Sequence, residues 1–94
     1  MKATVTEDLL KQIRSRSKSE RQEIGDAINR VLESWGRPHA HSGIGIRRLT
    51  QTIFECRVGM DDRLAFVFMA SPPELVFFFI GNHDEIQKLI RSNR

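Results

Sequence analysis

Apolar residues recur at steps of three and four between positions 24 and 35, the strongest periodic pattern in the chain. This spacing lines them along one face and predicts a helix from about Lys18 to Trp35. Ser17 and Glu20 have the spacing of a capping box that would start this helix, and Gly36 favours a left-handed residue just past its end. The apolar face consists of Ile24, Ala27, Ile28, Val31, Leu32 and Trp35.

A shorter amphipathic helix is predicted just before it. Thr6 is a favourable N-cap, and the acidic Glu7 and Asp8 suit the positive end of a helix dipole. This helix should end between Ser15 and Ser17, which leaves a tight connection, so the two helices should form an antiparallel pair. The apolar residues of the shorter helix are Leu9, Leu10 and Ile13.

Beyond a predicted loop at Pro38–Gly45, the apolar period changes from helical to alternating, which predicts strands. The intervals between these strands are too short for crossover helices, so the sheet beyond its first strand should be an antiparallel meander. A short helix containing Ile86, Leu89 and Ile90 should follow. The expected strands are Ile44–Leu49, Ile53–Val58, Leu64–Ala70 and Leu75–Ile80.

The side chains also predict how the strands pair. With Val58 opposite Leu64 and Cys56 opposite Phe66, one face of the sheet is continuously apolar and can receive the helix pair. The opposite face then carries Glu55, Arg57, Ala65 and Val67. We therefore expect a single α+β domain over residues 1–94, in which an N-terminal antiparallel helix pair packs on a four-stranded, mainly antiparallel sheet and a short helix ends the chain.

Composition narrows the class of protein. The chain has 94 residues, 39% hydrophobic and 29% charged, as is typical of one globular domain, and no apolar run approaches the ~20 residues of a membrane span. The single cysteine, Cys56, is expected to be a buried core thiol, and the absence of a secretory signal pattern favours the cytoplasm. Eleven of the fifteen basic residues are arginine, whose rigid fork suits phosphate contacts.

Ionisable residues at strand positions and strand ends are the candidate chemistry, namely Glu55, Arg57, Arg63 and His83. Neighbouring guanidinium groups repel each other unless an anion joins them, so Arg57 and Arg63 form either a surface ion-pair cluster or a clamp for a phosphodiester. Imidazole changes charge near neutral pH. His83 is therefore either a helix cap or a general acid or base, with Glu55 as its partner in proton transfer.

Further basic residues would form a rim around this cluster and are predicted to bind RNA, although charges of this kind are often only a solvated surface. The predicted RNA-binding residues are Arg47, Arg48, Lys11 and Arg14. His39 and His41 are a weak metal signal without acidic or cysteine companions, and we interpret them as loop residues. No metal and no cofactor are expected.

Four segments resemble the RelE/ParE superfamily of toxins from type II toxin-antitoxin modules. They are Arg47–Leu49, Phe54–Gly59, Arg63–Phe68 and Ile80–Ile86, in a chain whose order of helix, helix and meander is also similar. RelE-like members enter the ribosomal A site and cut messenger RNA without a metal. The resemblance thus implies an endoribonuclease toxin that acts with the ribosome and mRNA, with Arg57 and Arg63 on the phosphate and His83 transferring protons.

The resemblance leaves the target open. Many ribosome-dependent members carry a tyrosine shortly after the position of His83, whereas this chain has no tyrosine and has Gln87 nearby. A sister branch similar to ParE inhibits DNA gyrase without cutting RNA, and an inactive partner-binding module is a further alternative. All three imply an antitoxin partner, which would cover the apolar surface expected around Phe77, Phe79 and the last helix.

Overall fold

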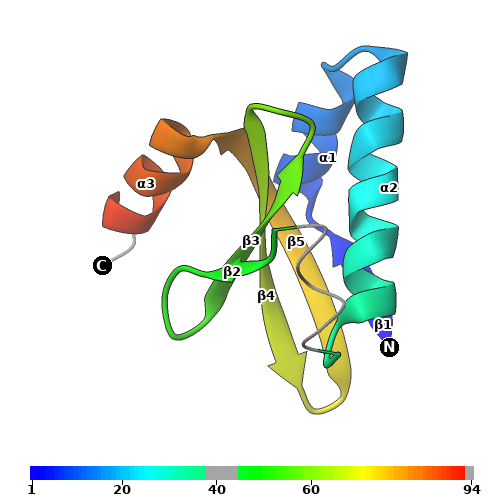
Figure 1. The fold of residues 1–94 in the computed structure, drawn as a ribbon, viewed down its shortest axis with the longest axis vertical. Helices are drawn as coiled ribbons and strands as arrows, with labels where there is room; N and C mark the ends of the chain where they lie inside the picture. Colours follow the sequence, from blue (N-terminus) through cyan, green and yellow to red (C-terminus); the bar gives the residue numbers. More distant parts are fainter. Residues whose placement is uncertain (38–44, 93–94) are drawn as a thin grey trace.

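The computed structural model describes residues 1–37 and 45–92, which form a mixed sheet with two helices on one face and a third helix on the other (Figure 1). The strands lie in the order β1-β5-β4-β3-β2; β1 is parallel to β5, and the other neighbours are antiparallel. The elements are β1 Lys2–Val5, α1 Glu7–Arg14, α2 Lys18–Ser34, β2 Arg47–Arg48, β3 Ile53–Val58, β4 Asp62–Ala70, β5 Pro73–Asn82 and α3 His83–Ser92. The α+β class is confirmed.

The helix boundaries follow their caps. The hydroxyl of Thr6 accepts a hydrogen bond from the backbone N–H of Leu9 at the start of α1. At the start of α2, the Ser17 hydroxyl accepts from the N–H of Glu20, and the Glu20 carboxylate accepts from the N–H of Ser17. These bonds lower the pKa of Glu20. Gly36 follows α2 with φ +83°, so the predicted left-handed residue is confirmed.

The sheet has one strand more than the four expected. β1 pairs in parallel with β5, with Val5 opposite Phe77, so it forms an edge of the sheet. Its partner lies some 70 residues away along the chain, and a four-residue strand carries no periodic signal long enough to reveal it. At the other edge, β2 is limited to Arg47–Arg48, shorter than the expected Ile44–Leu49, of which Ile44 lies outside the described residues.

The predicted register of β3 and β4 is wrong by two residues. Val58 lies opposite Asp62 rather than Leu64, and Cys56 lies opposite Leu64. The reason is a tighter turn, since Gly59 adopts φ +63° and only residues 59–61 connect the two strands. Because side chains alternate with a period of two, this shift leaves every residue on its predicted face.

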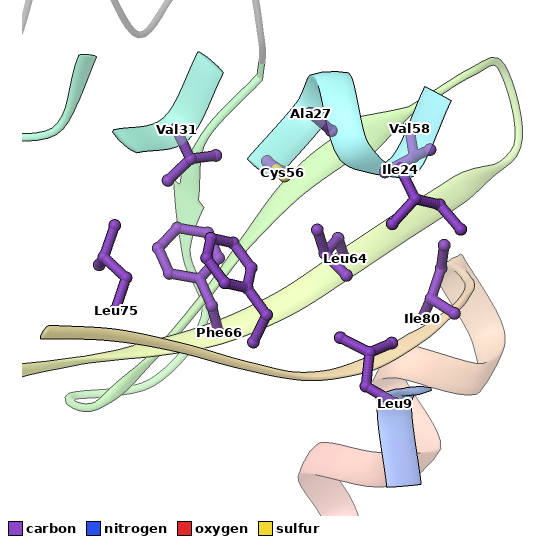
Figure 2. Close-up of a cluster of buried hydrophobic side chains, with 11 residues drawn as sticks. Leu9, Ile24, Ala27, Val31, Cys56, Val58, Leu64, Phe66, Leu75 and Ile80 are labelled. Carbon is purple, nitrogen blue, oxygen red and sulfur yellow. The ribbon is translucent and has the colours of Figure 1, made fainter. Parts of the chain in front are cut away.

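The core lies between the sheet and the α1–α2 pair (Figure 2). Phe66 is at its centre and is fully buried. The centroid of its ring lies 5.1 Å from that of Phe77, 5.6 Å from Trp35 and 5.8 Å from Phe54. The predicted helix stripe and the predicted strand face therefore meet here. The buried cluster comprises Leu9, Ile24, Ala27, Val31, Cys56, Val58, Leu64, Phe66, Leu75, Phe77 and Ile80.

β5 is covered along one edge by β1 and Gln12, and on its far face by α3. β1 reaches only as far as Phe77, and beyond it the side-chain amide of Gln12 takes the place of a neighbouring strand. Its Nε2 donates to the carbonyl of Ile80 at 2.8 Å, and its Oε1 accepts from the N–H of Ile80 at 3.1 Å.

On the far face of the sheet, α3 packs against β5 and β4, and its Ile86 is fully buried. None of the described helices is both long and apolar enough to cross a membrane.

Cys56 is expected to report global unfolding. Its thiol is fully buried, and burial raises its pKa to about 12. In the unfolded chain the pKa is about 8.5, so stability is unaffected below that pH and falls as the pH rises from about 9 towards 12. We expect a thiol reagent at pH 8 to label Cys56 only as fast as the protein unfolds, measured by labelling across a urea series. Rapid labelling in the absence of denaturant would contradict this placement.

Candidate nucleic-acid interface

Arg57 and Arg63 lie on the sheet face that is away from the α1–α2 pair. They are directly opposite each other on β3 and β4, and on its other side Arg63 is paired with Gly81 of β5. Directly paired residues project from the same face of a sheet. His83 follows Gly81 by two residues, as the first residue of α3. The strand order thus gathers the two arginines and the histidine at one end of this face.

A hollow of about 480 Å³ lies at this end of the sheet. The turn between β3 and β4 forms one part of its lining, and the junction of β5 and α3 forms another. Arg63 and His83 both line it, so the structure brings these two predicted residues into one space. The lining consists of Met60, Asp61, Arg63, Asn82, His83 and Asp84.

Glu55 lies beside this hollow but is buried. It is 1% exposed, and its Oε2 lies 3.3 Å from Nε of Arg63. Within the described part of the chain it is the only buried residue that carries a formal charge. Nη1 of Arg63 lies 3.4 Å from the carbonyl of Asp62, while Nη2 has no hydrogen-bond partner among the described residues. Glu55 therefore orients the guanidinium and leaves one nitrogen to meet a ligand.

Arg57 is exposed, and its side chain lies against Gly45 rather than in the hollow. A Cβ on Gly45 would lie only 2.9 Å from Nε of Arg57, so the arginine side chain runs over the glycine just before β2. Neither Arg57 nor His83 has an ion pair with a described residue. Arg57 and Arg63 thus spread from neighbouring positions on one face rather than meeting at one point.

The expected RNA-binding residues separate into two groups. Arg47 lies opposite Glu55 and is exposed, so it extends the basic face onto β2. Arg48 projects from the other face of the sheet. Its guanidinium carbon lies 5.3 Å from the ring centroid of Phe54, and its Nη2 donates to the carbonyl of Gln51. Lys11 and Arg14 are exposed on α1, on the other side of the sheet (Figure 1). The structure does not bring these two near Arg63.

The turn and the junction that form the hollow are held in place by polar contacts that the sequence motifs did not predict. Nη1 of Arg16 lies 2.6 Å from Oδ2 of Asp62, and this hydrogen bond raises the pKa of Arg16. Asn82 and Glu85 cap each other across the start of α3, with two hydrogen bonds of 2.9 Å. The spacing of these last two residues is a capping signature that would have located the start of α3.

Metal ligands do not gather in this region. Over residues 1–37 and 45–92, no three His, Cys, Asp or Glu side chains are placed so that they could hold an ion. His39 and His41 lie outside the described residues.

The fold is similar to that of two solved structures. One chain of an archaeal RelE-RelB complex from Pyrococcus horikoshii OT3 superposes with a TM-score of 0.67 at 14% identity, covering 86% of this chain and 92% of that chain. A YoeB/ParE toxin from Agrobacterium tumefaciens gives a TM-score of 0.67 at 18% identity, covering 88% and 99%. No protein-family model matches the sequence, and no curated protein matches it. The chain therefore has the fold of the RelE/ParE superfamily, as its sequence motifs predicted.

Proposed function

We propose that the chain is the toxin of a type II toxin-antitoxin module and that it cleaves messenger RNA on the ribosome. Its fold, shared with a chain of a RelE-RelB complex and with a YoeB/ParE toxin, supports the first part. The observation that carries the second part is the placement of Arg63 and His83 in one hollow, with Arg57 opposite Arg63. Two guanidinium groups and an imidazole suit a phosphodiester, because Arg57 and His83 have no ion pair with a described residue and Nη2 of Arg63 has no hydrogen-bond partner among them.

The chemistry would be a transesterification within the RNA. The 2′ oxygen attacks the neighbouring phosphorus, a cyclic phosphate forms, and the bond to the 5′ oxygen breaks. Arg63 stabilises the negative charge that develops on the phosphoryl oxygens, and Arg57 binds the adjoining backbone. His83 takes the proton of the 2′ hydroxyl and, once protonated, supplies a proton to the departing 5′ oxygen. Each proton taken from the attacking oxygen is thus returned to the leaving one.

Glu55 has a different role in this scheme from the proton transfer expected from sequence. Its carboxylate is buried and contacts Nε of Arg63, so it lies behind the guanidinium and not in the hollow. The ion pair between Oε2 of Glu55 and Nε of Arg63 restrains the guanidinium group. Glu55 is therefore a positioning residue, which prevents Arg63 from rotating away from the phosphate.

The antitoxin would cover the sheet face that carries Arg57 and Arg63. α3 and β5 form an apolar hollow of about 380 Å³ next to the basic residues. It is lined by Phe79, Glu85, Lys88, Leu89 and Ser92. An acidic chain with apolar anchors would complement both the apolar hollow and the neighbouring arginines, and it would fold as it binds.

Replacing His83 with alanine tests the cleavage step. His83 is exposed and makes no ion pair with a described residue, so the variant should fold normally. Loss of the proton-transfer group should slow cleavage about 100-fold or more. The measurement is the mapping of new 5′ ends in cellular messages after induction, with and without a translation inhibitor. Cuts should depend on translation and disappear in the variant.

The control is Arg21→Ala, which removes an exposed charge from α2, a helix on the other face of the sheet from Arg57 and Arg63. It should leave the cleavage map unchanged. Intact messages in cells whose growth is arrested by the wild-type chain would contradict RNA cleavage, and DNA damage signalling in those cells would favour gyrase as the target. Normal growth of cells that contain the folded chain would contradict the toxin proposal as a whole.

A further inference from the structure

The hollow beside Arg63 carries two carboxylates that phosphate binding does not explain. Asp61 at the β3–β4 turn and Asp84 in the first turn of α3 both line it, and both are exposed. Negative charges near a phosphate site weaken phosphate binding. Neither carboxylate forms an ion pair with Arg63 or with another described residue, so they do not serve to hold the arginine. Both are therefore available to a second kind of ligand group.

Met60 adds an apolar surface to the same lining. It is 93% exposed at the tip of the β3–β4 hairpin, the largest exposure among the large hydrophobic residues described. The turn holds it there, because Gly59 has φ +63° and Asp62 is fixed by Arg16. A thioether makes favourable contacts with aromatic rings. An aromatic group bound in the hollow would therefore have Met60 against its surface.

The lining thus combines a cation, an apolar side chain and hydrogen-bond acceptors within about 480 Å³, which is in the range of small-molecule sites. A nucleotide has the matching groups: a phosphate for Arg63, an aromatic base for Met60, and donors on the edge of the base for the carboxylates. Ionised Asp accepts hydrogen bonds and cannot donate them. A base that presents an exocyclic amino group fits, whereas uracil presents a carbonyl oxygen at the same position.

We propose that this hollow binds the base of the nucleotide next to the cleaved phosphate, and that Asp61 and Asp84 select bases with an exocyclic amino group over uracil. This inference rests on the proposed function, because it takes Arg63 as the phosphate site. Met60 supports the plane of the base without selecting among bases. The two aspartates are specificity-determining residues, and they leave the phosphate chemistry to Arg63 and His83.

The test uses binding, so that it does not depend on cleavage. Cytidine 3′-monophosphate and uridine 3′-monophosphate differ at the 4-position of the base, an amino group in one and a carbonyl oxygen in the other. The purified chain is titrated with each, and binding is followed by calorimetry or by NMR shifts of Met60 and His83. We expect the cytidine nucleotide to bind roughly fivefold more tightly. The double variant Asp61→Asn, Asp84→Asn should abolish this preference, since the asparagine amide can also donate to a carbonyl.

Three further variants complete the experiment. Met60→Ala should weaken binding of both nucleotides equally, and Arg63→Gln should weaken both strongly. Asp26→Asn, at an exposed position of α2, should change neither. Equal binding of the two nucleotides by the wild-type chain, absence of saturable binding of either, or a preference that survives the double variant would each overturn the inference. Selective binding by a chain that leaves messages intact would support the base selectivity of the hollow while contradicting the proposed cleavage.

Discussion

Replacing Arg63 with alanine is expected to abolish message cleavage, with a loss of at least about 100-fold. Among the residues that the structure describes, Arg63 is the one basic residue that contacts the buried carboxylate, is paired with Arg57 and lines the hollow with His83. Its Nη2 is free of described partners, so it would bind a phosphoryl oxygen directly. The measurement is the rate of cleavage of a defined message in a translating extract, with Arg21→Ala as the control.

The same substitution also damages the fold, which has to be separated from the loss of activity. It leaves Glu55 as a buried carboxylate without a cation, and removal of one partner from such a pair costs about 3 kcal/mol. The double variant Glu55→Gln, Arg63→Gln contains two neutral amides that can hydrogen-bond to each other. It should recover most of the lost free energy of unfolding and remain inactive. A double variant that cleaves normally would contradict the role of Arg63.

The single variant Glu55→Gln distinguishes the two roles considered for Glu55. The amide oxygen of Gln can still lie beside Nε of Arg63, so Gln should largely replace Glu55 as a positioning residue, and cleavage should fall by about tenfold or less. A proton-transfer group would not be replaced, and the loss would reach about 100-fold or more with a changed pH profile. The cleavage rate of this variant, measured against pH, therefore decides whether Glu55 positions Arg63 or transfers a proton as expected from sequence.

The helices were predictable because their signals are local. The capping box of Ser17 and Glu20, the periodic stripe that follows it and the left-handed Gly36 all lie within twenty residues and agree with one another. β1 was not predictable in the same way. Its four residues acquire their structure from pairing with β5, a contact between the two ends of the chain that no local pattern encodes.

The candidate site also combines features that local patterns predict with features that depend on long-range contacts. The period of two placed Glu55 and Arg57 on one face even though the register was wrong by two residues, since such a shift preserves the face. The length of the turn at Gly59 decides which residues of β3 and β4 lie opposite each other, and this length depends on the φ angle of Gly59. The participation of Met60 and Asp61 could not be inferred from spacing, because it depends on how close the hairpin tip lies to the start of α3.

Replacing Phe66 with alanine should destabilise the protein more than any change at the hollow. Its side chain is fully buried and its ring contacts those of Trp35, Phe54 and Phe77. Removing a buried ring of this kind costs about 3 to 5 kcal/mol, because the transfer free energy is lost and a cavity remains. A single domain has a free energy of unfolding of only about 5 to 15 kcal/mol, so the variant should be close to unfolding at 37 °C.

Phe68 provides the matched control on the same strand. It is 37% exposed and contacts Trp35 from the edge of the core, with ring centroids 5.4 Å apart. Phe68→Ala should therefore cost about 1 kcal/mol, mainly through the lost ring contact. Urea titrations of both variants, followed by tryptophan fluorescence of Trp35 and by labelling of Cys56, give the two values. Equal losses would mean that the aromatic cluster is centred on Trp35 and not on Phe66, and that β4 lies differently against α2.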